Sequence, residues 1–173
     1  MATNEELKSS KILLGEIKEI YYHENDRNQI LDNKASIGLT LVGVLLTLCA
    51  TNLQKYNFKK VNMNNFGDVL FNIIRLLLLL GVFFTLIMSL YRFYKVLTTK
   101  KYKHLKTDGF AKVNAMQEEN IISLTLTLLY KESIEHNRLV NDKKYKDIDK
   151  GINYIVLSVI LYVIYMISYK FIL

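Results

Sequence analysis

The sequence predicts an all-α integral membrane protein with three transmembrane helices, and three observations support this prediction. The 173 residues are 51% hydrophobic and 23% charged, and the apolar residues are gathered in long blocks rather than mixed with the charges. The chain has no proline and only seven glycines, so long uninterrupted helices are expected. The formal net charge of +7 suits contact with anionic lipid headgroups or with a polyanionic ligand.

Residues 1–34 are charged throughout and are expected to form a cytoplasmic N-terminal helix without a cleavable signal. Within this region, residues spaced alternately by four and three predict one helical face that packs on a neighbouring helix. Glu24 and Arg27 interrupt the face and are expected to pair, because they lie three residues apart. The face consists of Leu13, Ile17, Ile20, Glu24, Arg27 and Leu31.

Three apolar blocks have the length needed to cross a bilayer, since about 20 residues rising about 1.5 Å each span roughly 30 Å of hydrocarbon. The second block contains one charge, Arg75, whose cost of about 2.5–3.5 kcal/mol at the bilayer centre predicts an interfacial position. Tyr162 lies deep in the third block and is expected to need a polar partner. The predicted spans are residues 35–52, 69–91 and 152–173.

The connecting regions suggest the orientation. Residues 53–68 are predicted to be a short external loop and residues 92–151 a basic cytoplasmic helical region. Lysines are concentrated on both sides of that central region, so the positive-inside rule places the N-terminus on the cytoplasmic side of a bacterial inner membrane. The segment Ile121–Tyr130 alternates as a strand would, but helix formers flank it and no partner strand is present, so a buried helix is expected. Asp108 and Gly109 are the best turn signal.

A stripe of small and hydroxyl-bearing residues runs along one face of the first predicted span. Ser36, Thr40, Gly43 and Thr47 are spaced four, three and four apart and therefore share one helical face. Such a stripe permits close packing of helices, and in a closed oligomer it can also line a narrow wet pathway. Three spans cannot enclose a conducting path, so a pore would require a homo-oligomer such as a tetramer.

Basic residues beside aromatic residues form a second candidate site. Tyr94, Tyr102 and His104 lie among the lysines that follow the second span, an arrangement that could stack a base and hold phosphates. Lysines beside a span also fix orientation and contact anionic lipid, and this alternative stays open. The candidate ligand-binding residues are Arg92, Lys100, Lys101, Lys103, His104 and Lys106, with Arg138, Lys143 and Lys144 before the third span.

Other chemistry has little support in the sequence. His23, Glu24 and Asp26, and the pair Glu135 and His136, are candidate metal ligands, but adjacent residues point apart on a helix and no pair of histidines has the i,i+4 spacing of HExxH, so no metal or cofactor is expected. The single cysteine, Cys49, lies in an apolar block and is expected to be a buried small hydrophobe. No catalytic triad or glycine-rich phosphate loop is found, and an enzyme is not expected.

The segment "RNQILDNKASIGLTLVGVLLTL", residues 27–48, resembles small bacterial membrane effectors of nucleotide-signalled anti-phage defence. These are the SLATT domain family and the transmembrane effectors of Pycsar and CBASS operons. In the latter, a charged helix enters the first span through a junction that matches Asp32, Lys34, Ala35 and Ser36 here. "YRFYKVL", residues 91–97, is similar too, so the likeness covers about the first 100 residues, whereas the third span departs from the simplest two-span form.

The resemblance implies a function in abortive infection. A partner nucleotidyltransferase or cyclase would make a cyclic or linear nucleotide messenger, and the effector would respond by permeabilising the membrane. The ligand would be this messenger and not duplex nucleic acid. The main alternative is a non-conducting anchor or adaptor subunit for another protein. A transporter subunit is disfavoured, because it would need broken helices that a chain without proline does not suggest.

Overall fold

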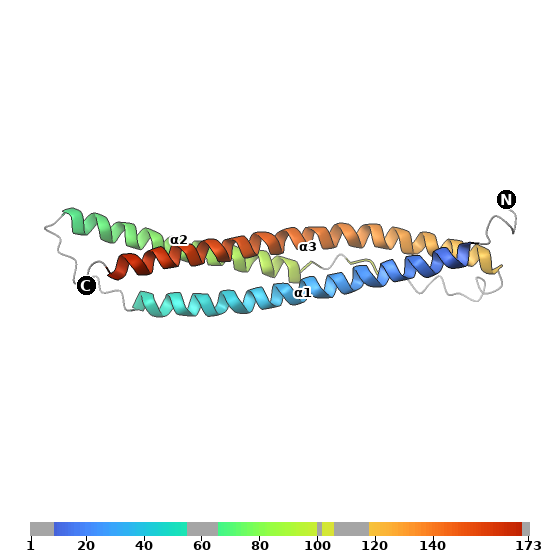
Figure 1. Ribbon diagram of the computed structural model, residues 1–173, viewed down its shortest axis with the longest axis horizontal. Helices are drawn as coiled ribbons and strands as arrows, with labels where there is room; N and C mark the ends of the chain where they lie inside the picture. The colour runs from blue at the N-terminus through green and yellow to red at the C-terminus, as the bar shows by residue number, and fades with distance from the viewer. Residues whose placement is uncertain (1–8, 55–65, 100–101, 106–117, 171–173) are drawn as a thin grey trace. The chain divides into compact units, whose positions relative to one another are not determined.

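The computed structural model describes residues 9–54, 66–99, 102–105 and 118–170, and these contain three helices (Figure 1). They are α1 (Ser10–Gln54), α2 (Phe66–Leu97) and α3 (Glu119–Lys170). Each contains a stretch long and apolar enough to cross a membrane, and the described residues include no strand. The all-helical fold with three candidate spans is therefore confirmed.

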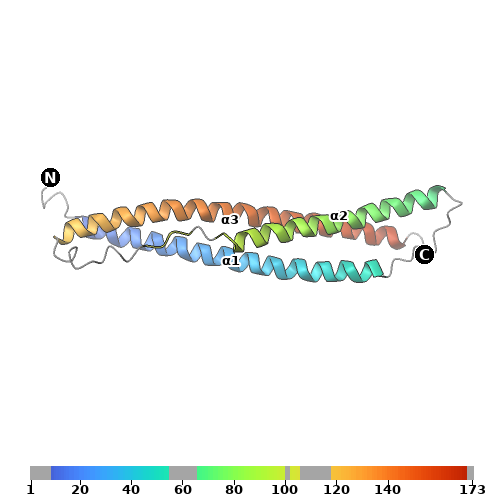
Figure 2. The ribbon, with the colours of Figure 1, turned by 180° about the vertical axis from the view of Figure 1, so that it is seen from behind.

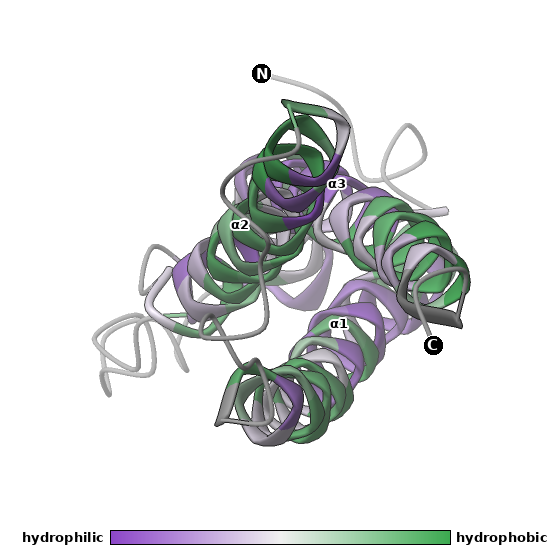
Figure 3. Ribbon diagram, turned by 90° about the vertical axis from the view of Figure 1, so that its left-hand side faces the viewer, coloured by the Kyte–Doolittle hydropathy of each residue, from purple (hydrophilic) through white to green (hydrophobic). Residues whose placement is uncertain are grey.

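All three helices are longer than the roughly 20 residues that a span requires, and α1 and α3 are more than twice that length. The N-terminal region from Ser10 onward and the first span are parts of one helix, α1, and not separate elements. The segment Ile121–Tyr130 is helical, and α3 continues from it into the third span, as Figure 2 also shows. In Figure 3, α2 is coloured as hydrophobic over most of its length, whereas α1 and α3 each contain hydrophilic and hydrophobic parts. The absence of proline explains why these long helices are not interrupted.

The chain divides into two compact units. Unit 1 comprises Met1–Asp32 and Thr99–Tyr145, and unit 2 comprises Asn33–Thr98 and Lys146–Leu173. Unit 2 therefore contains the apolar part of every predicted span, and unit 1 contains most of the charged sequence.

Unit 2 is a bundle of α1, α2 and α3 in which most buried residues of each helix follow one another at intervals of three, four or seven; the exceptions are the adjacent buried pairs Thr85–Leu86 and Asp147–Ile148. This is the 3.5-residue period of helices that pack as a coiled coil. Helices α1 and α3 are parallel in unit 2. Gly38 and Gly151 both lie beside the ring of Phe93, and farther along the two helices Asn52 contacts Tyr162. The buried residues include Ala35, Gly38, Val42 and Cys49 of α1, Leu79, Val82, Leu86, Ser89, Phe93 and Val96 of α2, and Gly151, Ile155, Ser158 and Tyr165 of α3.

Within unit 2, helix α2 is antiparallel to α1 and α3. Ser89 donates a 2.8 Å hydrogen bond from Oγ to the backbone oxygen of Gly151, and the guanidinium of Arg75 lies 5.8 Å from the ring centroid of Tyr165. Low residue numbers in α2 therefore meet high numbers in α3. The three helices alternate in direction, which is what a chain that crosses a bilayer three times requires.

Unit 1 pairs the first part of α1 with the first part of α3, in parallel, through an unusually polar interface. Tyr21 contacts Tyr130 edge to face with ring centroids 5.3 Å apart, and Lys11 forms a 2.8 Å ion pair with Glu119. Ser123, Asn137 and Asn141 are buried on α3. The predicted face of α1 is partly wrong: Glu24 and Leu31 are buried, but Leu13 and Ile20 are exposed by 52% and 43%. Tyr21 and Asn28 contact α3 instead.

Candidate functional site

The predicted hydroxyl stripe lies on the outer side of α1. Ser36, Thr40, Gly43 and Thr47 are exposed, whereas Ala35, Gly38 and Val42 face α2 and α3. Thr40 donates from Oγ1 to the backbone oxygen of Ser36 at 3.1 Å, and Thr47 donates to that of Gly43 at 3.0 Å. A β-carbon at Gly43 would meet no atom within 4 Å. The stripe does not line the interior of the bundle, so another molecule can reach it.

Residues 102–105 form a short segment without regular secondary structure, which Asn137 of α3 binds through two hydrogen bonds in unit 1. The amide of Lys103 donates to Oδ1 of Asn137 at 2.7 Å, and Nδ2 of Asn137 donates to the oxygen of Lys103 at 2.9 Å. Asn137 is fully buried, and its side-chain amide uses both its acceptor and a donor on the backbone of this one residue. Burial raises the pKa of Tyr102 to about 12, and nearby Tyr21 and Glu24 add to the rise.

The lysine of this segment is already engaged. Nζ of Lys103 lies 2.6 Å from Oε1 of Glu132, and this contact lowers the pKa of the Glu132 carboxyl, which is exposed. His104 is exposed, with its ring centroid 5.5 Å from that of Tyr102. The other lysines predicted here, Lys100, Lys101 and Lys106, lie outside the described residues.

The second basic cluster of unit 1 faces carboxylates of α1. Glu24 accepts hydrogen bonds from Nδ2 of Asn141 at 2.9 Å and from Nε of Arg138 at 3.3 Å, and Nη1 of Arg27 lies 3.5 Å away. The predicted pairing of Glu24 with Arg27 is thus confirmed. Arg27 also donates to Asp142 at 2.7 Å, and this hydrogen bond raises the pKa of its guanidinium.

Lys144 is buried and pairs with two side chains of α1. Its side chain is 4% exposed, and Nζ donates to Oδ1 of Asn28 and to Oδ1 of Asp32, both at 2.7 Å. Lys143, the next residue, is exposed. Three cations and three carboxylates therefore balance in this cluster, which lowers its attraction for a polyanion. Its members are Arg27, Arg138, Lys144, Glu24, Asp32 and Asp142.

Arg92 lies in unit 2, where Asp147 of α3 binds it. Nη1 of Arg92 lies 2.9 Å from Oδ1 of Asp147, and Nζ of Lys95 lies 3.2 Å from Oδ2 of the same carboxylate. The side chain of Asp147 is only 10% exposed. The sequence analysis did not single out Asp147, Asn137 or Glu132, although a carboxylate near the end of a basic run is a signal that could have found Asp147.

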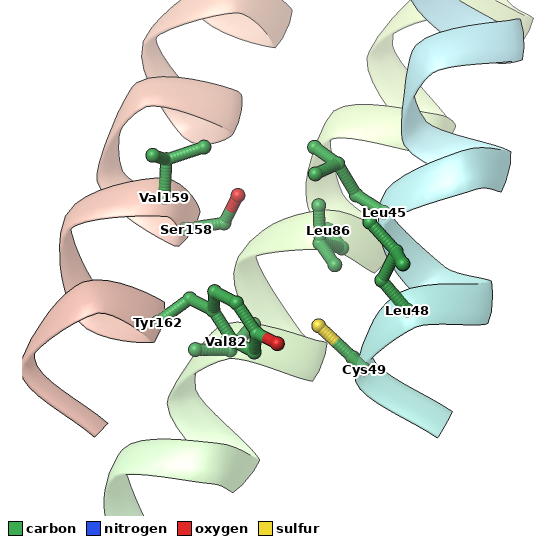
Figure 4. A pocket seen from close by; sticks show the side chains of 8 residues that line it. All are labelled: Leu45, Leu48, Cys49, Val82, Leu86, Ser158, Val159 and Tyr162. Carbon is green, nitrogen blue, oxygen red and sulfur yellow. The ribbon is translucent and has the colours of Figure 1, made fainter. Parts of the chain in front are cut away.

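The interior of unit 2 contains a small cavity among the three helices (Figure 4). Its volume of about 20 Å³ is large enough for one water molecule, but its almost entirely apolar walls offer such a molecule few hydrogen-bond partners. Tyr162 accepts a hydrogen bond from Nδ2 of Asn52, so its predicted polar partner is present, and Cys49 is buried as predicted. The lining residues are Leu45, Leu48, Cys49, Val82, Leu86, Ser158, Val159 and Tyr162.

Arg75 points into the bundle rather than away from it. The residue is 6% exposed, and its guanidinium faces the ring of Tyr165. A cation over an aromatic face is stabilised by about 0.5–2 kcal/mol, more as water is excluded. Its predicted position at the membrane interface stays a prediction. The described residues contain no group of three or more His, Cys, Asp or Glu side chains that could hold a metal ion.

Comparisons of this chain with protein-family models, with characterised proteins and with solved structures found no match. The evidence for a function therefore comes from the residues themselves and from the resemblance described above.

Proposed function

We propose that the chain is a homo-oligomeric membrane effector of anti-phage defence. In this proposal, copies of the chain form an ion-conducting path, and a nucleotide messenger that binds on the cytoplasmic side triggers conduction, membrane depolarisation and growth arrest. A ligand shifts such an equilibrium only if it binds the open arrangement more tightly than the closed one. The resemblance of residues 27–48 to known effectors motivates the proposal.

The outward position of the hydroxyl stripe is the observation that carries the proposal. Thr40 and Thr47 are exposed on the side of α1 that faces neither α2 nor α3. Polar residues that face lipid do not stabilise the chain. Between copies of the chain, they can pack closely or contact water and ions. Their hydroxyls donate to their own helix, which leaves the oxygen lone pairs as acceptors for a cation or a water molecule.

Conductance of the full-length chain in planar bilayers tests the proposal. We expect channel currents that rise when a cyclic mononucleotide or a cyclic oligonucleotide is added to one side. The double variant Thr40→Leu and Thr47→Leu should lose most of the current, because leucines would narrow and dry the path. Ile37→Leu and Val44→Leu, at exposed apolar positions of the same helix, are the matched control. Unchanged currents in the threonine variant would exclude the stripe as the lining.

The ligand response needs a separate test, because several candidate cations are held by carboxylates. We expect Lys100→Gln, Lys101→Gln and Lys103→Gln together to abolish the response while leaving any basal current. Lys150→Gln, exposed on α3, serves as the charge control. A response that survives the triple change would reject this basic run as the sensor.

A non-conducting anchor or adaptor is the second candidate function, and a specific observation favours it. Arg92, Lys103, Arg138 and Lys144 each pair with a carboxylate of this chain, so a polyanion would have to compete with Asp147, Glu132, Glu24 or Asp32. An anchor needs no such ligand and no lining. A reconstituted oligomer that carries no current with any nucleotide tested would support it.

A further inference from the structure

The first turns of α3 present their apolar side chains away from unit 1. Ser123 is 4% exposed and faces α1, and Tyr130 packs on Tyr21. The outer leucine patch is formed by Ile121 at 44%, Leu124 at 37%, Leu128 at 58% and Leu129 at 42% exposed. A helix on a water-facing surface has the opposite arrangement, with polar residues outside and apolar residues inside.

The bilayer does not explain this patch. The apolar run Ile121–Tyr130 is about half the length that a span requires, and charged residues adjoin it on both sides. Glu118 and Glu119 precede it, and Lys131 and Glu132 follow it. Burying one leucine side chain stabilises a protein by about 1.5–3 kcal/mol. Four large aliphatic side chains exposed on one face therefore indicate a surface that a protein partner covers.

We propose that the outer leucine patch is an interface at which α3 of one copy packs beside α3 of a second copy. Ile121, Leu124 and Leu128 are spaced three and four apart, as the buried residues of unit 2 are. This spacing is typical of the seam of a coiled coil. The proposal rests on the proposed function only in assuming that copies of the chain associate.

Two arguments select a second copy over a different protein. Chains inserted in one membrane share one orientation, so the same residues of neighbouring copies lie at the same height and their leucines meet leucines. The next residues along the stripe, Lys131 and Glu135, are both exposed, carry opposite charges and lie about one turn apart. A long lysine side chain can span that distance, so parallel copies bring Lys131 within reach of the opposing Glu135.

Cysteine crosslinking in membranes tests the interface, because the chain has a single cysteine that can be replaced first. In a Cys49→Ser background, we expect Leu124→Cys or Leu128→Cys to give a covalent dimer with a short bismaleimide. Ser123→Cys, buried inside unit 1 next to the patch, and Asp26→Cys, exposed on α1, are the controls and should give little or none. The double variant Leu124→Glu and Leu128→Glu should lower the oligomeric fraction in mild detergent, whereas Leu→Met changes should preserve it.

The other outcomes overturn either the interface or the proposed pore. Monomers in which cysteines at 124 and 128 react with a polar maleimide would mean that the patch faces water. Monomers in which they do not react would mean that something other than a second copy covers it. Crosslinked dimers that carry no current would support the interface and count against the proposed pore. Currents without crosslinks at these positions would uphold the pore and reject this interface.

Discussion

The ring of Phe93 fills the space that a β-carbon of Gly38 would need: such an atom would lie 2.5 Å from Cζ of the ring. Phe93 is 1% exposed, so its ring has no free space to swing into. On the other side of the ring, a β-carbon at Gly151 would lie 2.9 Å from the same atom. One aromatic side chain of α2 thus sets how closely α1 and α3 approach it.

Gly38→Ala should therefore destabilise unit 2, by about 1–3 kcal/mol, because overpacking in a full core forces side chains and backbone to shift. Gly151→Ala should cost somewhat less, since the ring is slightly farther away. Thermal unfolding in detergent micelles would measure both effects.

Gly43→Ala is the matched control for these two variants. It lies on α1 as Gly38 does, but a β-carbon there meets nothing within 4 Å. Alanine is favoured over glycine in a helix by about 1 kcal/mol, so this variant should be neutral or slightly stabilising. Equal losses for Gly38→Ala and Gly43→Ala would refute the role assigned to Phe93.

Asp147 of α3 joins this helix to the C-terminal end of α2 through Arg92 and Lys95. Asp147→Asn keeps the shape of the side chain but leaves two cations beside a neutral amide. Loss of one partner from a fully buried pair costs about 3–5 kcal/mol. Because Arg92 and Lys95 keep some contact with water, we expect about 1–3 kcal/mol. Asp149→Asn, exposed two residues later, should change stability by less than about 0.5 kcal/mol.

The unfolding midpoint of each variant in detergent would separate these expectations. If Asp147→Asn and Asp149→Asn have the same unfolding midpoint as the parent chain, the buried carboxylate contributes nothing measurable to the stability of unit 2. Arg92 would then be available to a ligand at no cost, and its place among the candidate ligand-binding residues would be strengthened.

The spans could be predicted from the sequence because a bilayer imposes a length and an apolar composition that few other structures need. Cys49 and the partner of Tyr162 followed from the same reasoning, because a polar group inside a span must find a partner. The continuity of α3 through Ile121–Tyr130 was also predictable, since helix formers flank that segment.

The inner face of α1 in unit 1 could not be predicted from α1 alone. Heptad patterns beginning at Leu13 and at Leu14 share Ile17, Glu24 and Leu31, and differ in whether Ile20 or Tyr21 lies inside. Hydrophobicity predicts that Ile20 faces α3, but Tyr21 takes that position because Tyr130 of α3 lies opposite it. The residue of α1 that faces inward thus depends on the side chains of α3. The pairing of Arg92 with Asp147 was missed for the same reason, because it too depends on a second helix.

Asn137 holds the segment at residues 102–105, and its removal should loosen that segment without unfolding α3. Asn137→Ala removes both hydrogen bonds to the backbone of Lys103, at a cost of about 1–3 kcal/mol. Hydrogen exchange at the Lys103 amide should then be about 10–100 times faster, because its protection depends on Oδ1 of Asn137.

Asn153→Ala, exposed on the same helix, is the control and should leave this exchange unchanged. Asn137→Asp should be intermediate, because a carboxylate still accepts from the Lys103 amide but cannot donate to its oxygen. Unaltered exchange in Asn137→Ala would show that other contacts hold the segment.

Tyr102 should make unit 1 sensitive to alkaline pH. Burial raises its pKa from 10.0 to about 12, so the folded chain holds this proton more tightly than the unfolded chain does. The resulting stability is fully present below about pH 10 and is lost as the pH rises toward about 12. Tyr102→Phe should flatten that fall in the unfolding midpoint, whereas Tyr145→Phe, at an exposed position, should leave it unchanged. Difference absorbance of tyrosinate between parent and Tyr102→Phe chains would give the pKa directly, and a value near 10 would mean that water reaches this hydroxyl.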